Sequence, residues 1–552
     1  MPGLFRVFLS VVALCCAWSS VLAAPVRAVK GNPPVVRLHI KDPAKTAEFA
    51  TSAVAAMVQL VGDSIEGATK CFGTEQFALL EPKKPLVMYL DVKETVRESN
   101  ILLLLPVKDE QSALKFLGGW GFNHSPAAGR ASSYVLTLGN TECAWMQMID
   151  TISYVGIGKF PDGLPKQDLR AYETLTDATA TEDITLEILP GRLPKEMIQN
   201  MEAGFVQYTT RLMQEKLKAP QITAIDLALA WLKWASKNFT AISSEAESVI
   251  VRIQHDLPTL NHTWEVRVKA KAKTDLAAWI TSYPQSTGRF HQLLNAESVF
   301  GKSLALNHFP DGLQAGHAKF FECNLDWLVQ LVPVPAVRSV LDQFNKQLKV
   351  NLDAGQCDAA SILNKPNDVG EYTGLLAIAC QNVAAREQSF KDAIAGLDKA
   401  NRAQFLLDAE KADGLRIHRM QFQECPASLE KAFGKRCVLH VGFGKEAMYA
   451  TVGPDGVALI KRADALKAKP GPAINLVHHT GRIKPFLQLI SGETGEENGV
   501  TRQTIGILGK NDQVRPVIIM TVTGGQELVM TFEQNRIAFL VFVAQVAMLM
   551  AR

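Results

Sequence analysis

Two Gly-Arg pairs are the residues of this sequence whose type and position point most directly to chemistry. Arg192 and Arg482 each follow a strand-like run and a glycine, at the expected start of a helix. Lys195 and Lys484 lie close behind them. Cations are disfavoured at a helix N-terminus unless something negative shares the site, so an anion or a buried carboxylate would explain them. Arg192 and Arg482 are therefore our candidate anion-binding residues, and a solvated turn is the alternative.

Histidine pairs offer little to a metal ion. His478 and His479 are adjacent in a predicted strand, so their side chains should point to opposite faces. His308 and His317 flank the turn sequence Pro310-Asp311-Gly312, and a hairpin could bring them together. No third ligand accompanies either pair, so we predict no metal site and no cofactor.

Motifs for catalysis are missing from the sequence. Gly156-Ile157-Gly158-Lys159 and Gly442-Phe443-Gly444-Lys445 resemble phosphate loops, but they lack the third glycine and the following helix. Both lie between strand-like runs, so hairpin turns or bulges are expected there. No carboxylate pair recurs at equivalent places, and no catalytic residue is therefore predicted.

The first 23 residues have the pattern of a secretory signal. Arg6 supplies a short positive region, Val7 to Trp18 is apolar, and small residues precede Ala23. About 12 apolar residues are fewer than the roughly 20 that span a bilayer. We expect export, cleavage near Ala23, a periplasmic or extracellular location, and no transmembrane anchor in the mature chain.

Cysteine usage fits an oxidising compartment. Two of the nine cysteines lie in the signal, which leaves an odd number in the mature chain: Cys71, Cys143, Cys323, Cys357, Cys380, Cys425 and Cys437. Cys425 with Cys437, or Cys357 with Cys380, are close enough in sequence to be candidates for pairing. Spacing alone does not decide between them.

Length and charge limit the classes of protein. A chain of 552 residues should contain two or more cores. Lys and Arg total 58 against 55 acidic residues, and no basic run could track a phosphate backbone, so nucleic acid is not an expected partner.

The elements that must position these residues recur in the same order in both halves. A strand at 101–107 precedes a helix at 111–117, and a strand at 375–380 precedes a helix at 388–394. Further matched segments are 35–40 with 319–322, 160–163 with 453–456, 184–188 with 474–477, 249–253 with 504–508, and 264–270 with 516–522. We predict an α+β protein made of two tandem copies of a unit, each with a curved, mostly antiparallel sheet packed by helices.

The predicted domains are a signal peptide (1–23), a first α+β unit (24–296) and a second (297–552), divided near Ala296. Two unrelated α+β domains are the alternative. The apolar segment Ile537 to Ala551 is short for a membrane span and is expected to be a core helix, with membrane-surface or partner docking as the alternative.

Three motifs carry a resemblance to a known group. They are Lys84-Pro85-Leu86-Val87-Met88-Tyr89-Leu90, Leu103-Leu104-Leu105-Pro106-Val107-Lys108-Asp109, and Phe160-Pro161-Asp162-Gly163-Leu164. The chain resembles large exported bacterial proteins of unknown function, typical of planctomycetes. The resemblance covers most of the mature chain and implies no catalytic residue.

The sequence therefore favours an exported, non-enzymatic binding or structural protein. A lipid or other apolar or amphipathic ligand is one expectation, because curved apolar sheets covered by helices can open a groove. Protein partners in the cell envelope are another. The competing hypothesis is a secreted hydrolase whose site is assembled from residues far apart in sequence.

Overall fold

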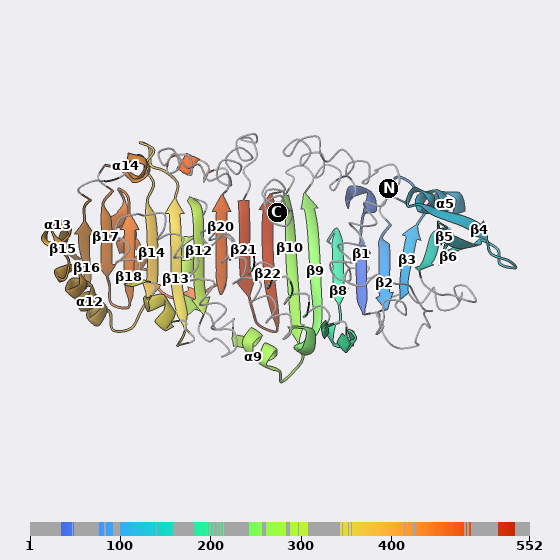
Figure 1. Ribbon diagram of the computed structural model, residues 1–552, viewed down its shortest axis with the longest axis horizontal. Coiled ribbons are helices and arrows are strands. Elements are labelled where there is room, and N and C mark those ends of the chain that lie inside the picture. Colours follow the sequence, from blue (N-terminus) through green and yellow to red (C-terminus); the bar gives the residue numbers. More distant parts are fainter. Residues whose placement is uncertain are drawn as a thin grey trace. The chain divides into compact units, whose positions relative to one another are not determined.

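The computed structural model describes residues 35–46, 77–91, 100–157, 182–196, 242–256, 261–282, 287–306, 343–412, 414–422, 425–479 and 517–535, with gaps of one or two residues inside some ranges and isolated residues nearby. The described elements separate into two compact units that meet in sequence after Lys271. Each unit contains one antiparallel sheet with helices packed on it (Figure 1).

The first unit is built on ten strands that pair with antiparallel neighbours. Along the sheet they are β10 (Asn261–Ala270), β9 (Ala246–Asp256), β8 (Ile184–Ile188), β1 (Val36–Ile40), β2 (Leu86–Asp91), β3 (Asn100–Pro106), β7 (Ile152–Ile157), β6 (Thr141–Ile149), β5 (Ser133–Leu138) and β4 (Phe122–Pro126).

Helix α5 (Glu110–Gly119) covers one face of this sheet. Asp109 begins the helix, because its carboxylate accepts the amide N–H of Ser112 at 2.7 Å. Phe116 and Leu117 then pack on strand residues such as Leu105 in one core cluster. Burial of these apolar side chains is the main force that holds the helix on the sheet.

The second unit also contains ten strands in its main sheet. In order across it they are β22 (Glu527–Asn535), β21 (Val517–Thr523), β20 (Ile474–His479), β12 (Ser298–Leu306), β13 (Cys357–Asn364), β14 (Gly374–Ala379), β18 (Ala447–Val452), β17 (Leu439–Phe443), β16 (Leu415–Met420) and β15 (Phe405–Ala412). A two-stranded ladder of β11 (Thr287–Gly288) and β19 (Lys469–Pro470) is separate.

Helices lie on both faces of the second sheet. On one face, α15 (Gly456–Asp464) and the 3-10 turn η5 (Phe290–Leu293) pack in a core cluster with strand residues such as Tyr449. On the other face, α12 (Val383–Ala395) packs through Phe390 against the ring of Phe443 at 5.5 Å. The alternating residues of each strand therefore enter two different cores.

The strand order is the same in the two units. Counted along the chain without β11 and β19, the strands stand in each sheet in the order ten, nine, eight, one, two, three, seven, six, five, four. A helix follows the third strand in both, α5 in the first unit and α12 in the second. The prediction of a mixed α and β protein with mostly antiparallel sheets is confirmed for the described residues.

The topology corrects two of the sequence correspondences. Strand β12 holds the place of β1, so the match of 35–40 with 319–322 is wrong and the segment equivalent to 35–40 lies earlier in the chain. Strand β22, and not 516–522, holds the place of β10. Short apolar runs resemble one another in sequence. The strands with which each run pairs decide which segments are equivalent, and the sequence does not show those partners.

The boundary between the units lies earlier than the predicted position near Ala296. The segment before it belongs to the second unit, because the carboxylate of Asp358 in β13 accepts the amide of Arg289 at 2.8 Å and faces that of Phe290 at 3.4 Å. The pairing of β11 with β19 fixes the same segment.

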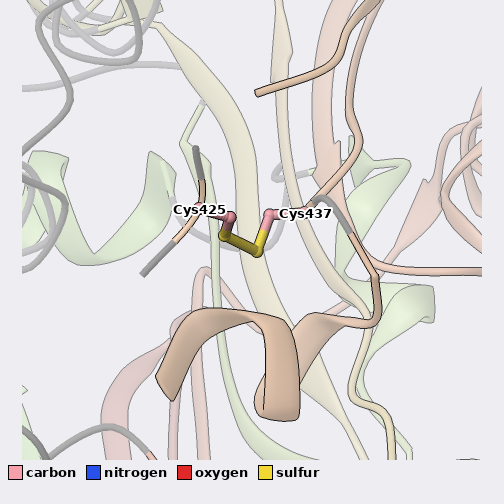
Figure 2. The surroundings of a disulfide bond; sticks show 2 residues. All are labelled: Cys425 and Cys437. Carbon is pink, nitrogen blue, oxygen red and sulfur yellow. A yellow bond between two sulfur atoms is a disulfide. The ribbon is translucent and has the colours of Figure 1, made fainter. Parts of the chain in front are cut away.

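A disulfide joins Cys425 and Cys437 on either side of α14 (Ala427–Phe433), as Figure 2 shows. This is one of the two predicted pairings. The other does not form, because Cys357 and Cys380 are free and buried. Burial raises the pKa of both thiols, to about 11 for Cys380, so neither is a ready nucleophile.

Within the described segments, no helix is both long enough and apolar enough to cross a bilayer. The predicted signal segment and the apolar segment 537–551 lie outside the described residues.

Candidate functional site

An open groove lies over the start of β15 and the end of β16 in the second unit. Its volume is about 490 Å³, and its lining residues are Ala403, Gln404, Phe405, Leu406, Arg419, Gln421 and Phe422. Pockets for small ligands usually span about 300–1,000 Å³ and combine apolar walls with a few polar groups. The groove has a volume in that range, but more of its exposed lining is polar than apolar, and Arg419 is the one charged residue among its seven.

The groove is held open at the sheet edge by the pairing of β15 with β16. Leu406 and Arg419 are direct cross-strand partners, so an apolar and a cationic side chain lie on the same face. Leu406 is 49% exposed, so part of its side chain is accessible to a ligand. Phe422, in contrast, is buried and anchors the floor. Among the described strands β15 pairs with β16 alone and so leaves one backbone edge open.

A second cluster lies under the same two strands, on the α12 face of the sheet. Glu387 of α12, Asp408 of β15 and His418 of β16 each present a ligand-type atom within 4.8 Å of the others. Glu387 and His418 are almost fully buried. Such a set could in principle bind a metal or act as an acid and base pair, so its hydrogen bonds decide its role.

The bonds already made at His418 exclude both of those roles for its ring. Its Nδ1 accepts the backbone N–H of Asp408 at 2.9 Å, so the neutral ring must carry its proton on Nε2. Nε2 faces Glu387 Oε1 at 3.4 Å. With one nitrogen accepting and the other protonated, no lone pair is left for a metal ion or for a substrate proton.

The carboxylates of the cluster are paired with cations. Lys391 Nζ lies 2.7 Å from Glu387 Oε1, and Arg416 pairs with the other oxygen of Glu387. Asp408 pairs with Lys391 at 3.4 Å and with Lys411 at 3.3 Å. These residues form an ion-pair network around the buried Glu387 and do not fit a metal centre.

The pKa values agree with that assignment. Burial lowers the pKa of His418, and the nearby positive charge of Lys391 lowers it further, against the opposing effect of Glu387 and Asp408. The pKa of Lys391 is raised, chiefly by its contact with Glu387. At neutral pH the imidazole is therefore neutral and the lysine charged.

The first unit contains a different polar cluster. Buried Asp183 accepts Lys45 Nζ with both oxygens at 2.8 Å and the backbone N–H of His255 at 2.6 Å. Burial lowers the pKa of His255 and of its cross-strand partner His262 to about 4. The cluster ties the helical turn after Asp42 to β9 and has no open face for a ligand that the described residues show.

Lys302 of β12 is a further perturbed group. Burial lowers its pKa to about 7, although its side chain keeps some contact with solvent. The neighbouring Cys357 acts in the opposite direction. A lowered pKa by itself does not make a lysine a nucleophile, so no chemical role is assigned to Lys302.

The predicted anion-binding arginines occupy similar places, after β8 in the first unit and after β20 in the second. Arg192 is the last residue of the 3-10 turn η3 (Pro190–Arg192), and helical residues begin at Lys195. Arg482 lies close enough to Glu297 to lower the pKa of that carboxyl, after the larger effect of Lys365. Glu297 is exposed, so it is not the buried carboxylate expected as one of the two reasons for Arg482, and anion binding at both arginines stays a prediction.

The other sequence motifs have structural roles where they are described. Gly442 to Lys445 forms the hairpin between β17 and β18, as predicted. His478 and His479 are consecutive in β20 and so belong to opposite faces. His308, His317 and residues 158–163 lie outside the described residues.

Sequence reasoning missed the groove and the network beneath it. A signal for the network exists: Arg416 and His418 alternate with Leu415 and Ile417, which puts two polar side chains on the face opposite the two apolar ones. The acidic partner on α12 could not be assigned without knowing which helix covers that face.

Comparisons with known proteins give no assignment. No family model and no curated protein matches the chain. The solved structure "Structure of crystal form III of TP0453" is 11% identical, with a TM-score of 0.23, over 46% of this chain and 82% of that chain. A likeness at that level does not establish a shared fold or function.

Proposed function

We propose that the chain is an exported, non-enzymatic binding protein that holds an apolar or amphipathic ligand in the groove on β15 and β16. The observation that carries the proposal is the pairing of exposed Leu406 with Arg419 in an open groove of about 490 Å³. An apolar ligand chain that covers Leu406 would remove exposed apolar surface from water, which favours binding.

The groove chemistry favours a ligand with an apolar chain and an anionic group. Phe405 and Leu406 offer apolar surface, and Arg419 is the charged residue of the lining. A guanidinium binds a carboxylate or phosphate in a two-pronged fashion, so the anionic end of the ligand would lie at Arg419. Gln404 and Gln421 add neutral hydrogen-bonding groups.

Export is part of the proposal. The signal-like pattern before Ala23 supports it, and so does the Cys425–Cys437 disulfide, because such bonds form and persist mainly in oxidising compartments. Membership of a group of exported bacterial proteins is likewise proposed on the motifs described above.

A tandem duplication is our explanation for the two units. The identical order of ten strands and the helix after the third strand support it. Superposing experimental structures of the two sheets tests the idea: equivalent strands should overlay in register, with α5 on α12. Sheets whose helices fall on opposite faces would argue for independent origins.

The binding proposal is tested with a matched pair of variants. Leu406→Glu puts a charge in the groove, and Leu138→Glu changes a leucine of nearly equal exposure, 49% against 50%, in the other unit. A fluorescent anionic C16 fatty-acid probe, displaced by palmitate, should bind the wild type and Leu138→Glu alike. Leu406→Glu should bind the probe at least tenfold more weakly, because the variant loses apolar surface and its negative charge repels the anionic ligand.

Arg419→Gln tests the contribution of the ligand's anionic group apart from that of its apolar chain. It should weaken palmitate binding severalfold and leave the uncharged alcohol, hexadecanol, unaffected. Equal binding by Leu406→Glu and wild type, or no saturable binding by wild type, would refute the proposal.

A further inference from the structure

His418 connects the helix α12 to an irregular part of the edge strand β15. The ring is buried between Phe390 and Phe443, with ring centroids 5.4 and 5.5 Å away. Its Nδ1 accepts the backbone N–H of Asp408 at 2.9 Å. This bond joins a side chain of one strand to the backbone of the next, in place of an ordinary ladder bond.

The bonded residue lies in a bulge. The register of β15 on β16 shifts between Leu406 and Glu410, so the residues between them lack regular partners. Asp408 has φ of +52°, a left-handed conformation that is uncommon for non-glycine residues and that aspartate tolerates better than most. The hydrogen bond from its N–H to His418 helps to fix the backbone there.

Charged groups from three elements surround the ring, either beside it or paired with the carboxylates next to it. Helix α12 contributes Glu387 and Lys391, β15 contributes Asp408 and Lys411, and β16 itself contributes Arg416. From β17 the described neighbour is the uncharged ring of Phe443. The nearest alternative partner for Nδ1 is Asp408 Oδ1, at 3.9 Å.

We propose that His418 is a proton-operated latch, which holds the bulge of the edge strand β15 in place at neutral pH and releases it in acid. The latch goes beyond ligand binding, and its operation does not require that the groove be occupied. It acts on the strand that carries the exposed Leu406 and Leu407.

The release follows from the chemistry of the ring. A proton added to Nδ1 takes the lone pair that accepts the Asp408 N–H, so two N–H groups then face each other. The new N–H finds its acceptor in Asp408 Oδ1, which must leave Lys391 and Lys411 to approach. The backbone of Asp408 then loses the bond that fixed its left-handed conformation.

The direction of the pH dependence is settled by burial. Because burial lowers the pKa of His418 below its ordinary 6.5, the latch stays closed near neutral pH and opens only on acidification below that value. In the unfolded chain the ring takes its proton first, so this group stabilises the native strand above pH 6.5 and the stabilisation falls as the pH falls.

Hydrogen exchange with mass spectrometry tests the latch on the full chain. The protection factor of the 405–412 peptide, corrected for intrinsic pH effects and divided by that of β17 and β18, should fall roughly tenfold between pH 7 and pH 4 in the wild type. His418→Asn places an amide oxygen where Nδ1 was and cannot titrate, so its ratio should stay flat. His440→Asn, on the neighbouring strand, should behave as wild type.

Asp408→Asn is a second variant that keeps the left-handed backbone and the N–H but removes the acceptor charge. Its release should move to lower pH by at least half a unit, since the protonated ring loses its anionic partner. The latch is refuted if His418→Asn keeps the wild-type pH dependence, or if Asp408→Asn releases at the wild-type pH.

Discussion

Replacing the buried Glu387 with glutamine tests the ion-pair network most sharply. The change preserves the shape of the side chain and removes its charge, which leaves Lys391 and Arg416 without their shared anion. Removing one partner of a fully buried pair costs about 3–5 kcal/mol. Lys391 is 26% exposed and Arg416 40% exposed, so water can partly replace the lost charge, and we expect about 2.5 kcal/mol.

Urea unfolding followed by pulsed hydrogen exchange measures this cost within the second unit. With an m-value of about 3 kcal/mol/M, peptides of β16 to β18 should unfold at a midpoint lower by about 0.8 M. Glu410→Gln is the matched control, because its pair with Lys461 is nearly half exposed on both sides and should contribute at most about 0.5 kcal/mol. Equal midpoints for Glu387→Gln and Glu410→Gln would refute the claim that the network is a buried structural element.

Three further outcomes follow from other parts of the chain. Replacing Cys425 and Cys437 with serine should lower the free energy of unfolding of the second unit by about 3 kcal/mol, since the bond closes a loop with a sequence separation of 12, and reductant should do the same to the wild type alone. Acidification should destabilise the first unit, because the folded pKa of His255 and His262 is about 4, below the unfolded value of about 6.5. The stability they contribute is complete above pH 6.5 and falls toward pH 4 by at most about 3 kcal/mol per histidine. Urea midpoints compared across pH should fall less in His262→Phe than in the wild type. Gly453→Ala should lower the free energy of unfolding by at least about 2 kcal/mol, because φ is +108° and a Cβ would collide with a neighbouring backbone carbonyl. The thermal midpoint should fall accordingly, and an unchanged midpoint would contradict that geometry.

Local elements could be predicted from the sequence because their causes are local. The N-cap at Asp109, the strand at 184–188 and the hairpin at Gly442 to Lys445 follow from capping, apolar runs and turn residues. The disulfide could be narrowed to two pairs by sequence separation. All of these depend on residues within about a dozen positions of each other.

The groove and the network could not be predicted because they depend on contacts between distant elements. Glu387 meets His418 only when α12 covers that face of β16, and β15 forms an open edge only when no other strand pairs with it. The same reason explains the two wrong correspondences between the units, where apolar runs matched in type but not in pairing.

Photo-crosslinking tests the proposed binding site most directly. A palmitate analogue with a diazirine in its chain would be incubated with the full-length protein, irradiated, and the labelled residues located by mass spectrometry. The groove predicts labels within 403–406 and 419–422, lost in Leu406→Glu and kept in Leu138→Glu. Labels spread evenly over both units, or unchanged in Leu406→Glu, would contradict the assignment of a ligand to this groove.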